Sequence, residues 1–294
     1  MKEFKGKVAV ITGSASGMGR AVAERFAQEG MKVVLADVEQ KALAQAEKEL
    51  KAAGATVLAV RTDVSKAEDW EALARKTLDT FGAVHILHNT AGVSTEGYSI
   101  LETPMNDWKW VINVNLWGVI HGVMTFCPIM LKQDTECHIV NTSSMAGLIS
   151  NPYSGSYNVS KFGIVTLSET LYHELTLMHA KVGVSVLCPG LVNTRLGDAD
   201  RNRPSELRND PAEEKKLRAL PQVMKLGTLG REMFKTAMSP KQVADMVFNA
   251  IKEGKFYIIT HPEFLAAVQT RMEEILQQRQ PTSSLATLVF PGGL

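Results

Sequence analysis

A tyrosine and a lysine four residues apart could form a proton-transfer pair in this chain. Tyr157 and Lys161 lie in a stretch whose composition and spacing predict the first turns of a helix. Residues four apart share one face of a helix, so the phenol and the ammonium can point into one cleft. A free tyrosine has a pKa of about 10, and a nearby cation stabilises its phenolate. The pair could therefore act as a base near neutral pH.

A glycine-rich turn follows the first predicted strand. It reads Thr-Gly-Ser-Ala-Ser-Gly-Met-Gly from Thr12 to Gly19, and an amphipathic helix begins directly after it. Such glycines let the backbone approach a pyrophosphate, whose charge is stabilised by free N–H groups at the helix N-terminus. No Lys-Ser or Lys-Thr pair follows the second glycine, so a P-loop is not favoured. The residues predicted to bind the dinucleotide phosphates are Gly13, Ser16, Gly17, Met18 and Gly19.

Asp37 stands at the end of the second predicted strand, directly after residues 33–36 and eighteen residues after Gly19. In dinucleotide-binding folds an acidic residue about 20 positions further on hydrogen-bonds the adenosine ribose. A carboxylate there repels a 2′-phosphate, and neither the turn nor Val38 supplies a basic residue to bind one. NAD is therefore the predicted cofactor. Asp37 could instead cap the next helix, a position that Asp favours.

The surrounding elements must bring these residues together. Short β-branched runs alternate with longer helical patterns, which predicts parallel βαβ units. We expect an α/β fold of the Rossmann type, a doubly wound parallel sheet of about seven strands with helices on both faces. The predicted strands are 8–12, 33–36, 57–61, 86–89, 138–141, 184–188 and 256–260. The predicted helices are 17–29, 39–53, 66–81, 108–130, 155–179, 240–253 and 262–280.

The 294 residues are expected to form a single domain, 1–294, because α/β folds often have this length. Residues 197–237 depart from the alternation, being polar and interrupted by Pro204, Pro211 and Pro221. A substrate lid is predicted there, with a flexible linker as the alternative. Residues 262–294 are expected to form a C-terminal helix and a tail that either packs on a neighbouring subunit or is disordered.

Composition excludes several classes of protein. Lys plus Arg is 32 and Asp plus Glu is 31, a net charge of +1, which indicates no nucleic-acid partner. No apolar run reaches the roughly 18 to 20 residues of a membrane span and no signal peptide is recognisable, so we expect a cytoplasmic protein. The three cysteines, Cys127, Cys137 and Cys188, are widely spaced, which indicates buried apolar side chains and no metal site.

Together these motifs resemble the short-chain dehydrogenase/reductase family, in its single-domain branch. The resemblance covers about residues 5–194. Members carry a serine thirteen residues before the tyrosine, which is Ser144 here, and an Asn-x-x-Gly element, matched from Asn115 to Gly118. The resemblance therefore implies a catalytic tetrad of Asn115, Ser144, Tyr157 and Lys161.

Further cofactor contacts are implied by the same resemblance. The usual Asn-Asn-Ala-Gly is Asn-Thr-Ala-Gly here, starting at Asn89, and its retained residues suit strand support and close approach to the ribose. Tyr157 and Lys161 are both implied to contact the cofactor as well, and Lys161 would bind the nicotinamide ribose. The remaining implied contacts are Asp63 and Val64 at the adenine, Asn89, Ala91 and Gly92 at the ribose, and Pro189, Gly190, Val192 and Thr194 at the nicotinamide.

The implied reaction is hydride transfer between NAD and a secondary alcohol or ketone. Tyr157 would act as general acid–base, and Ser144 would hold the substrate oxygen. Lys161 would lower the tyrosine pKa, and Asn115 would hold a water in a proton relay. The substrate-facing positions are Met145, Tyr153, Leu191 and Leu196, which are mostly apolar and predict a medium or bulky hydrophobic substrate.

Two further expectations concern partners and the alternative function. Family members are mostly homodimers or homotetramers assembled through their long helices, and we expect the same of this chain. A non-catalytic NAD-binding redox sensor would use the same nucleotide fold. Such proteins tend to lose the tyrosine or the lysine, and both are present here.

Overall fold

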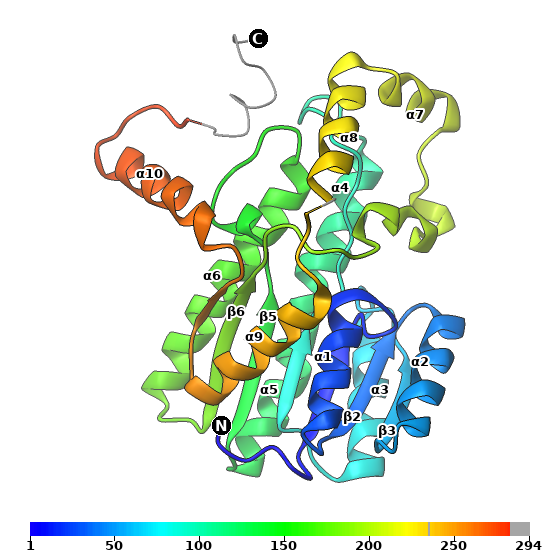
Figure 1. The fold of residues 1–294 in the computed structure, drawn as a ribbon, viewed down its shortest axis with the longest axis vertical. Coiled ribbons are helices and arrows are strands. Elements are labelled where there is room, and N and C mark those ends of the chain that lie inside the picture. Colours follow the sequence, from blue (N-terminus) through cyan, green and yellow to red (C-terminus); the bar gives the residue numbers. More distant parts are fainter. Residues whose placement is uncertain (235, 283–294) are drawn as a thin grey trace.

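A seven-stranded parallel β-sheet forms the centre of the structure, a computed structural model that describes residues 1–234 and 236–282 (Figure 1). The strand order is β3-β2-β1-β4-β5-β6-β7, so the direction of winding reverses between β1 and β4. Ligands of such sheets bind at the carboxyl ends of the strands near this reversal. The strands are β1 (Val8–Thr12), β2 (Lys32–Asp37), β3 (Val57–Arg61), β4 (Ile86–Asn89), β5 (Cys137–Thr142), β6 (Val182–Cys188) and β7 (Tyr257–Ile259).

Helices cover both faces of the sheet. Successive residues of a strand point to opposite faces, so Val8 and Val10 join one apolar core while Ala9 and Ile11 join the other. This burial on both sides explains why the strands are continuous apolar runs, and the doubly wound fold is confirmed. One face carries α1 (Gly17–Gln28), α2 (Gln40–Ala52) and α9 (Pro240–Glu253), and the other carries α3 (Ala67–Phe81), α5 (Gly118–Gln133) and α6 (Gly155–Leu177).

The predicted helix 108–130 is longer than expected and irregular in the middle. It runs through α4 (Met105–Val111), a π-helical stretch from Ile112 to Trp117, and α5. Single π-turns within α-helices are frequent at functional sites, and Asn115 lies in this one. Met105–Gln133 is long and apolar enough to span a membrane, contrary to our reading of the apolar runs. In the fold, however, Phe126 and Met130 of this helix are buried in the core against the sheet.

Residues 196–234 form a helical segment at the carboxyl end of the sheet (Figure 1). It contains 3-10 helices at Leu196–Asn202 and Ser205–Leu207, then α7 (Pro211–Arg218) and α8 (Pro221–Phe234). The sequence pattern predicts no helix there, because proline in the interior of a helix would interrupt it. Pro211 and Pro221 instead open α7 and α8, since the first turn of a helix needs no N–H donor from proline.

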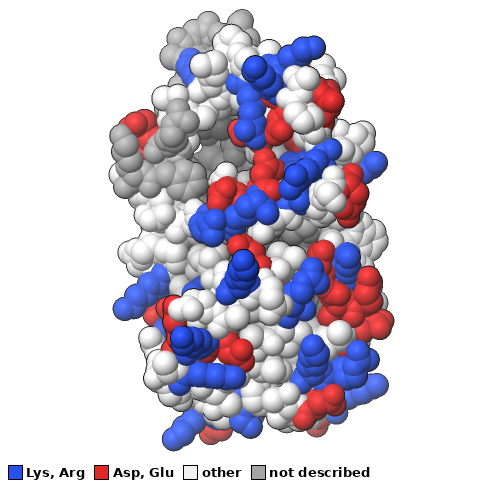
Figure 2. All heavy atoms as spheres, turned by 90° about the vertical axis from the view of Figure 1, so that its right-hand side faces the viewer, with Lys and Arg blue, Asp and Glu red and all other residues white. Residues whose placement is uncertain are grey.

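Beyond β7, a 3-10 helix at Pro262–Phe264 leads into α10 (Leu265–Leu276), which projects away from the sheet (Figure 1). The predicted helix 262–280 therefore ends earlier, and most of the predicted tail lies outside the described residues. On the face shown in Figure 2, positive and negative side chains are interspersed without a patch of one sign. This distribution agrees with the balanced composition.

Candidate active site

A cavity of about 810 Å³ lies between the carboxyl ends of the strands and the helical segment 196–234. Two of the predicted site residues, Asn89 and Asn115, are buried behind its wall. The other predicted residues line the cavity: Gly13, Ser16, Gly17, Met18, Gly19, Asp37, Asp63, Val64, Ala91, Gly92, Ser144, Met145, Tyr153, Tyr157, Lys161, Pro189, Gly190, Leu191, Val192, Thr194 and Leu196.

The glycine-rich turn packs too closely for side chains. Gly13 has φ +63°, and a Cβ on it would lie 2.9 Å from the Cα of Ala91. A Cβ on Gly19 would lie 2.3 Å from the carbonyl oxygen of Gly13. Thr12 Oγ1 accepts hydrogen bonds from the N–H groups of Thr90 at 3.0 Å and Ala91 at 3.2 Å, which ties the turn to the loop after β4. The N-terminus of α1 is thereby held against the cavity, where it can bind an anion.

Asp37 links the glycine-rich turn to the loop that precedes α2. Its Oδ2 accepts a hydrogen bond from Ala15 N at 2.9 Å, and its Oδ1 accepts one from Glu39 N, also at 2.9 Å. Burial raises the pKa of Asp37, and these backbone hydrogen bonds only partly offset that effect. Glu39 is the N-cap residue of α2, so Asp37 lies two residues before the N-cap position and does not cap this helix.

Tyr157 and Lys161 lie on one face of the first turns of α6. Lys161 is buried, its Nζ donates to the carbonyl oxygen of Thr142 at 3.1 Å, and it lies 5.4 Å from the centre of the Tyr157 ring. Burial lowers the pKa of Lys161 to about 8. Burial also raises the pKa of Tyr157, and a hydrogen bond with Ser144 lowers it in part. The expected fall in the tyrosine pKa is therefore wrong for the protein alone, because desolvation of the phenolate dominates.

Ser144 follows β5 and begins a short 3-10 helix. Its Oγ accepts a hydrogen bond from Ala146 N at 3.1 Å and donates one to the carbonyl oxygen of Pro189 at 3.4 Å. The neighbouring Ser143 Oγ donates to the carbonyl oxygen of Lys161 at 2.8 Å. These bonds hold the end of β5, the start of α6 and the loop after β6 in one fixed arrangement.

The two buried asparagines support the wall of the cavity. Asn115 Oδ1 accepts from Val93 N at 2.8 Å, and its Nδ2 donates to Val93 O at 3.0 Å and to Ser160 Oγ at 3.2 Å. Asn89 Nδ2 donates to Asn141 Oδ1 at 2.9 Å, which links β4 to β5. The side-chain amide of Asn115 is thus already engaged by protein groups and positions the loop after β4.

The tertiary structure adds residues that the motifs did not indicate. Glu39 forms hydrogen bonds with Arg201 and Asn202, more than 160 residues away, and all three line the cavity. No local sequence signal identifies such a pair. The apolar part of the cavity is extended by Val93, Ile149, Val223, Leu226, Leu229 and Phe264. Tyr153, on the same side, has φ +62°, which is uncommon for a residue with a side chain.

A parallel sheet with a phosphate turn after β1 and a serine, tyrosine and lysine beside it defines a class of dinucleotide-binding oxidoreductases. A family model described as short chain dehydrogenase matches residues 7–204. The chain belongs to the short chain dehydrogenase family, as its motifs predicted.

Relatives match over almost the whole chain. A CLA biosynthesis dehydrogenase/reductase of Lactiplantibacillus plantarum is 33% identical, over 96% of this chain and 97% of its own. A C alpha-dehydrogenase of Sphingobium is 31% identical, over 97% of this chain and 90% of its own. The crystal structure of a short chain dehydrogenase/reductase from Burkholderia phymatum in complex with NAD superimposes with a TM-score of 0.91 and 48% identity, covering 96% and 99% of the two chains.

Proposed function

We propose that this protein transfers a hydride between NAD and a medium or bulky hydrophobic secondary alcohol or ketone. One observation carries the proposal: Ser144, Tyr157 and Lys161 meet in a cavity that has the glycine-rich turn and Asp37 on one side and apolar residues on the other. Relatives named as dehydrogenases and reductases, and a neighbour that binds NAD, support the same reaction class.

The residues present fit a dinucleotide. Gly13 and Gly19 leave no room for side chains at the turn, so the backbone is free to approach a pyrophosphate at the start of α1. Asp37 would bind the adenosine ribose, and Lys161 would bind the nicotinamide ribose. Bound there, NAD would supply the hydride acceptor or, when reduced, the hydride donor.

The side chains would then handle the proton and the substrate oxygen. Because its pKa is raised, Tyr157 holds its proton at neutral pH and can give it to a carbonyl oxygen during reduction. Lys161, with a pKa of about 8, carries a positive charge at neutral pH and stabilises the phenolate that remains. Ser144 Oγ would hold the substrate oxygen. A relay water at Asn115 would bind the main-chain carbonyl, because the side-chain amide is engaged.

The helical segment 196–234 would act as the substrate lid, since Leu196 and Val223 contribute to the apolar wall. It would exclude water from the reacting groups. We further propose that the chain forms a single domain, assembles as a homodimer or homotetramer, and works in the cytoplasm.

The test is turnover of a panel of secondary alcohols, from small to steroid-sized, with NAD and with NADP. Tyr157→Phe should lower the rate by about 10² to 10⁴ with a much smaller change in NAD affinity, because the ring is kept and only the hydroxyl is lost. Calorimetry with NAD checks the affinity. If the wild-type protein binds NAD but turns over no alcohol of the panel, the redox sensor replaces the enzyme as the better interpretation.

A further inference from the structure

We propose that Glu39 and Arg201 together set the choice between NAD and NADP, an inference that rests on the proposed function. Glu39 binds an arginine that the fold brings to the ribose end of the cavity, and so prevents this arginine from binding a 2′-phosphate. Asp37 would then be one of two acidic residues that disfavour NADP, and Glu39 would be the other.

In the contact between Glu39 and Arg201, one carboxylate oxygen of Glu39 accepts several hydrogen bonds. Glu39 Oε1 accepts from Arg201 Nε at 3.0 Å, from Arg201 Nη2 at 2.7 Å and from Asn202 Nδ2 at 3.0 Å. The third nitrogen, Arg201 Nη1, donates to the carbonyl oxygens of Arg195 at 3.0 Å and Asp198 at 2.6 Å. The guanidinium is thus held by its own segment, and its Nε–Nη2 edge faces Glu39.

Both members of the pair are charged, and their side chains are only partly exposed to water. Their side chains are 22% exposed for Arg201 and 21% for Glu39. Burial raises the pKa of Glu39, but the hydrogen bonds from Arg201 and Asn202 outweigh it and the net pKa is lowered. The carboxylate therefore stays ionised and keeps the arginine edge occupied near neutral pH.

The pair lies next to the carboxylate that marks the ribose site. Glu39 N donates to Asp37 Oδ1 at 2.9 Å, and Asp37, Glu39 and Arg201 all line the same cavity. The sequence around Asp37 contains no basic residue at Val38, so local reasoning finds no partner for a 2′-phosphate. The fold supplies one from a position 162 residues further along the chain.

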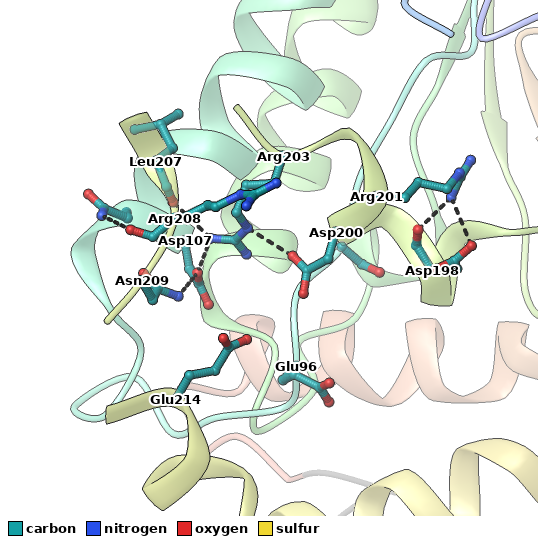
Figure 3. Close-up of polar contacts among 12 residues, drawn as sticks. Glu96, Asp107, Asp198, Asp200, Arg201, Arg203, Leu207, Arg208, Asn209 and Glu214 are labelled. Atoms are coloured by element: carbon teal, nitrogen blue, oxygen red, sulfur yellow. Dashed lines mark hydrogen bonds and ion pairs between the residues drawn. The ribbon is translucent and has the colours of Figure 1, made fainter. Parts of the chain in front are cut away.

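Arg201 is the arginine of this stretch that hydrogen-bonds Glu39. Arg195 also lines the cavity, but its Nη2 donates to Asp198 Oδ2 at 2.7 Å. Arg203, two residues on, projects to the other side, between Asp107 and Asp200 (Figure 3). It also lies 4.3 Å from the centre of the Trp110 ring. Arg203 therefore fastens the segment to α4, whereas Arg201 faces the cofactor half of the molecule.

Charge explains how the pair would discriminate. A 2′-phosphate adds about −1.5 to −2 charges at neutral pH and is repelled by both Asp37 and Glu39. The Nε–Nη2 edge of an arginine can bind two phosphate oxygens at once, and here Nη1 is already engaged by its own segment. Removing Glu39 deletes one repulsive charge and frees that edge, so NADP should gain affinity while NAD loses little.

The experiment is calorimetric measurement of Kd for NAD and for NADP with wild-type protein and with Glu39→Ala and Glu39→Gln. In Glu39→Ala the ratio Kd(NADP)/Kd(NAD) should fall about tenfold or more, the effect of one new charged pair. Glu39→Gln should give a smaller fall, because its amide oxygen still accepts from Arg201. In the double variant Glu39→Ala, Arg201→Met, the ratio Kd(NADP)/Kd(NAD) should return most of the way to the wild-type value.

Glu214→Gln is the matched control. It removes a carboxylate that binds Arg218 at 2.8 Å within the same helical segment, and neither residue lines the cavity. Its Kd ratio should equal that of the wild-type protein. An unchanged ratio in both Glu39 variants, or an equal loss of both dinucleotides, would overturn the inference and leave the proposed function intact. Failure of the wild-type protein to bind either dinucleotide would overturn the proposed function and this inference with it.

Discussion

The charge of single buried residues in this molecule is determined mainly by desolvation. Tyr157 and Lys161 are shifted toward their neutral forms, although the sequence suggested that their proximity would favour the charged pair. A low-dielectric site disfavours any isolated charge, and the nearest opposite charge has to outweigh that cost. For Glu39 it does, because Arg201 and Asn202 both bind the carboxylate.

Three histidines of the central sheet region should make the protein less stable in mild acid. Burial lowers the pKa of His85 to about 4 and those of His88 and His138 to about 3. In the unfolded chain they titrate near 6.5, so between about pH 6.5 and pH 3 the unfolded state binds more protons. Their contribution to the free energy of unfolding is fully present above about pH 6.5 and is lost as the pH falls toward about 3. For the fully buried His88 and His138 the loss approaches ~1.4 kcal/mol per pH unit each.

Urea unfolding between pH 7 and pH 4.5, with calorimetric measurement of proton uptake, checks this expectation. His88→Gln should take up about one proton fewer on unfolding at pH 5 than the wild-type protein. Proton uptake that is the same in both proteins would show that His88 is not held neutral by the fold.

At the scale of elements, a buried ion pair attaches the helical segment 196–234 to α4. Arg203 Nη1 lies 2.6 Å from Asp107 Oδ1, and the side chains are 7% and 2% exposed (Figure 3). Asn209 Nδ2 donates to the same oxygen at 2.7 Å. Because α4 leads directly into the π-helical stretch that contains Asn115, this attachment connects the segment to the wall of the cavity.

Asp107→Asn should therefore destabilise the protein by about 3 kcal/mol, because it leaves the Arg203 cation buried without its closest partner. The low end of the usual range is expected, since Asp200 still binds Arg203 at 2.8 Å. The KM for the hydrophobic substrate should rise severalfold, with little change in Kd for NAD. Chemical unfolding and steady-state kinetics give the two quantities.

Glu214→Gln, in the more exposed pair with Arg218, serves as the comparison and should cost about 1 kcal/mol or less. If both variants lost the same free energy of unfolding, burial would not make the Asp107–Arg203 pair stronger than the Glu214–Arg218 pair. An unchanged KM in Asp107→Asn would contradict its effect on the cavity.

At the scale of the whole molecule, apolar side chains remain exposed on the two long helices. Trp117 and Met124 on the helix that contains α5 are 48% and 70% exposed, and Val159 on α6 is 52% exposed. Exposed apolar residues grouped on neighbouring elements commonly mark interfaces between subunits. They agree with the family expectation of a homodimer or homotetramer assembled through these helices.

Size-exclusion chromatography with light scattering should show that oligomer, and Met124→Lys should shift it toward monomer because a charge would be buried in the interface. Met224→Lys on α8 changes a residue that is 61% exposed, and it should leave the oligomer intact. A monomeric wild-type protein would refute this expectation. If Met124→Lys and Met224→Lys shifted the oligomeric state equally, the long helices would not be the interface.

Much of this protein could be predicted from local patterns. The strands are short, continuous apolar runs because both of their faces are buried. The glycine-rich turn follows from the stereochemistry of glycine, and the shared face of Tyr157 and Lys161 follows from the helical period of 3.6 residues. The alternation of strands and helices predicted the doubly wound sheet, and the family followed from the order of the motifs. Each motif depends on residues close together in the chain, whereas the fold class and the family depend on the order in which these motifs and elements follow one another.

The tertiary structure alone decided the remaining features, because they depend on distances in space. Whether Asn115 holds a water or the loop at Val93 depends on what the fold packs against it. The direction of the Tyr157 pKa shift depends on how much protein surrounds the phenol. The pairing of Glu39 with Arg201 joins residues that have no relation in sequence. Motifs specify which groups are present, whereas burial and long-range contacts determine their charge and their partners.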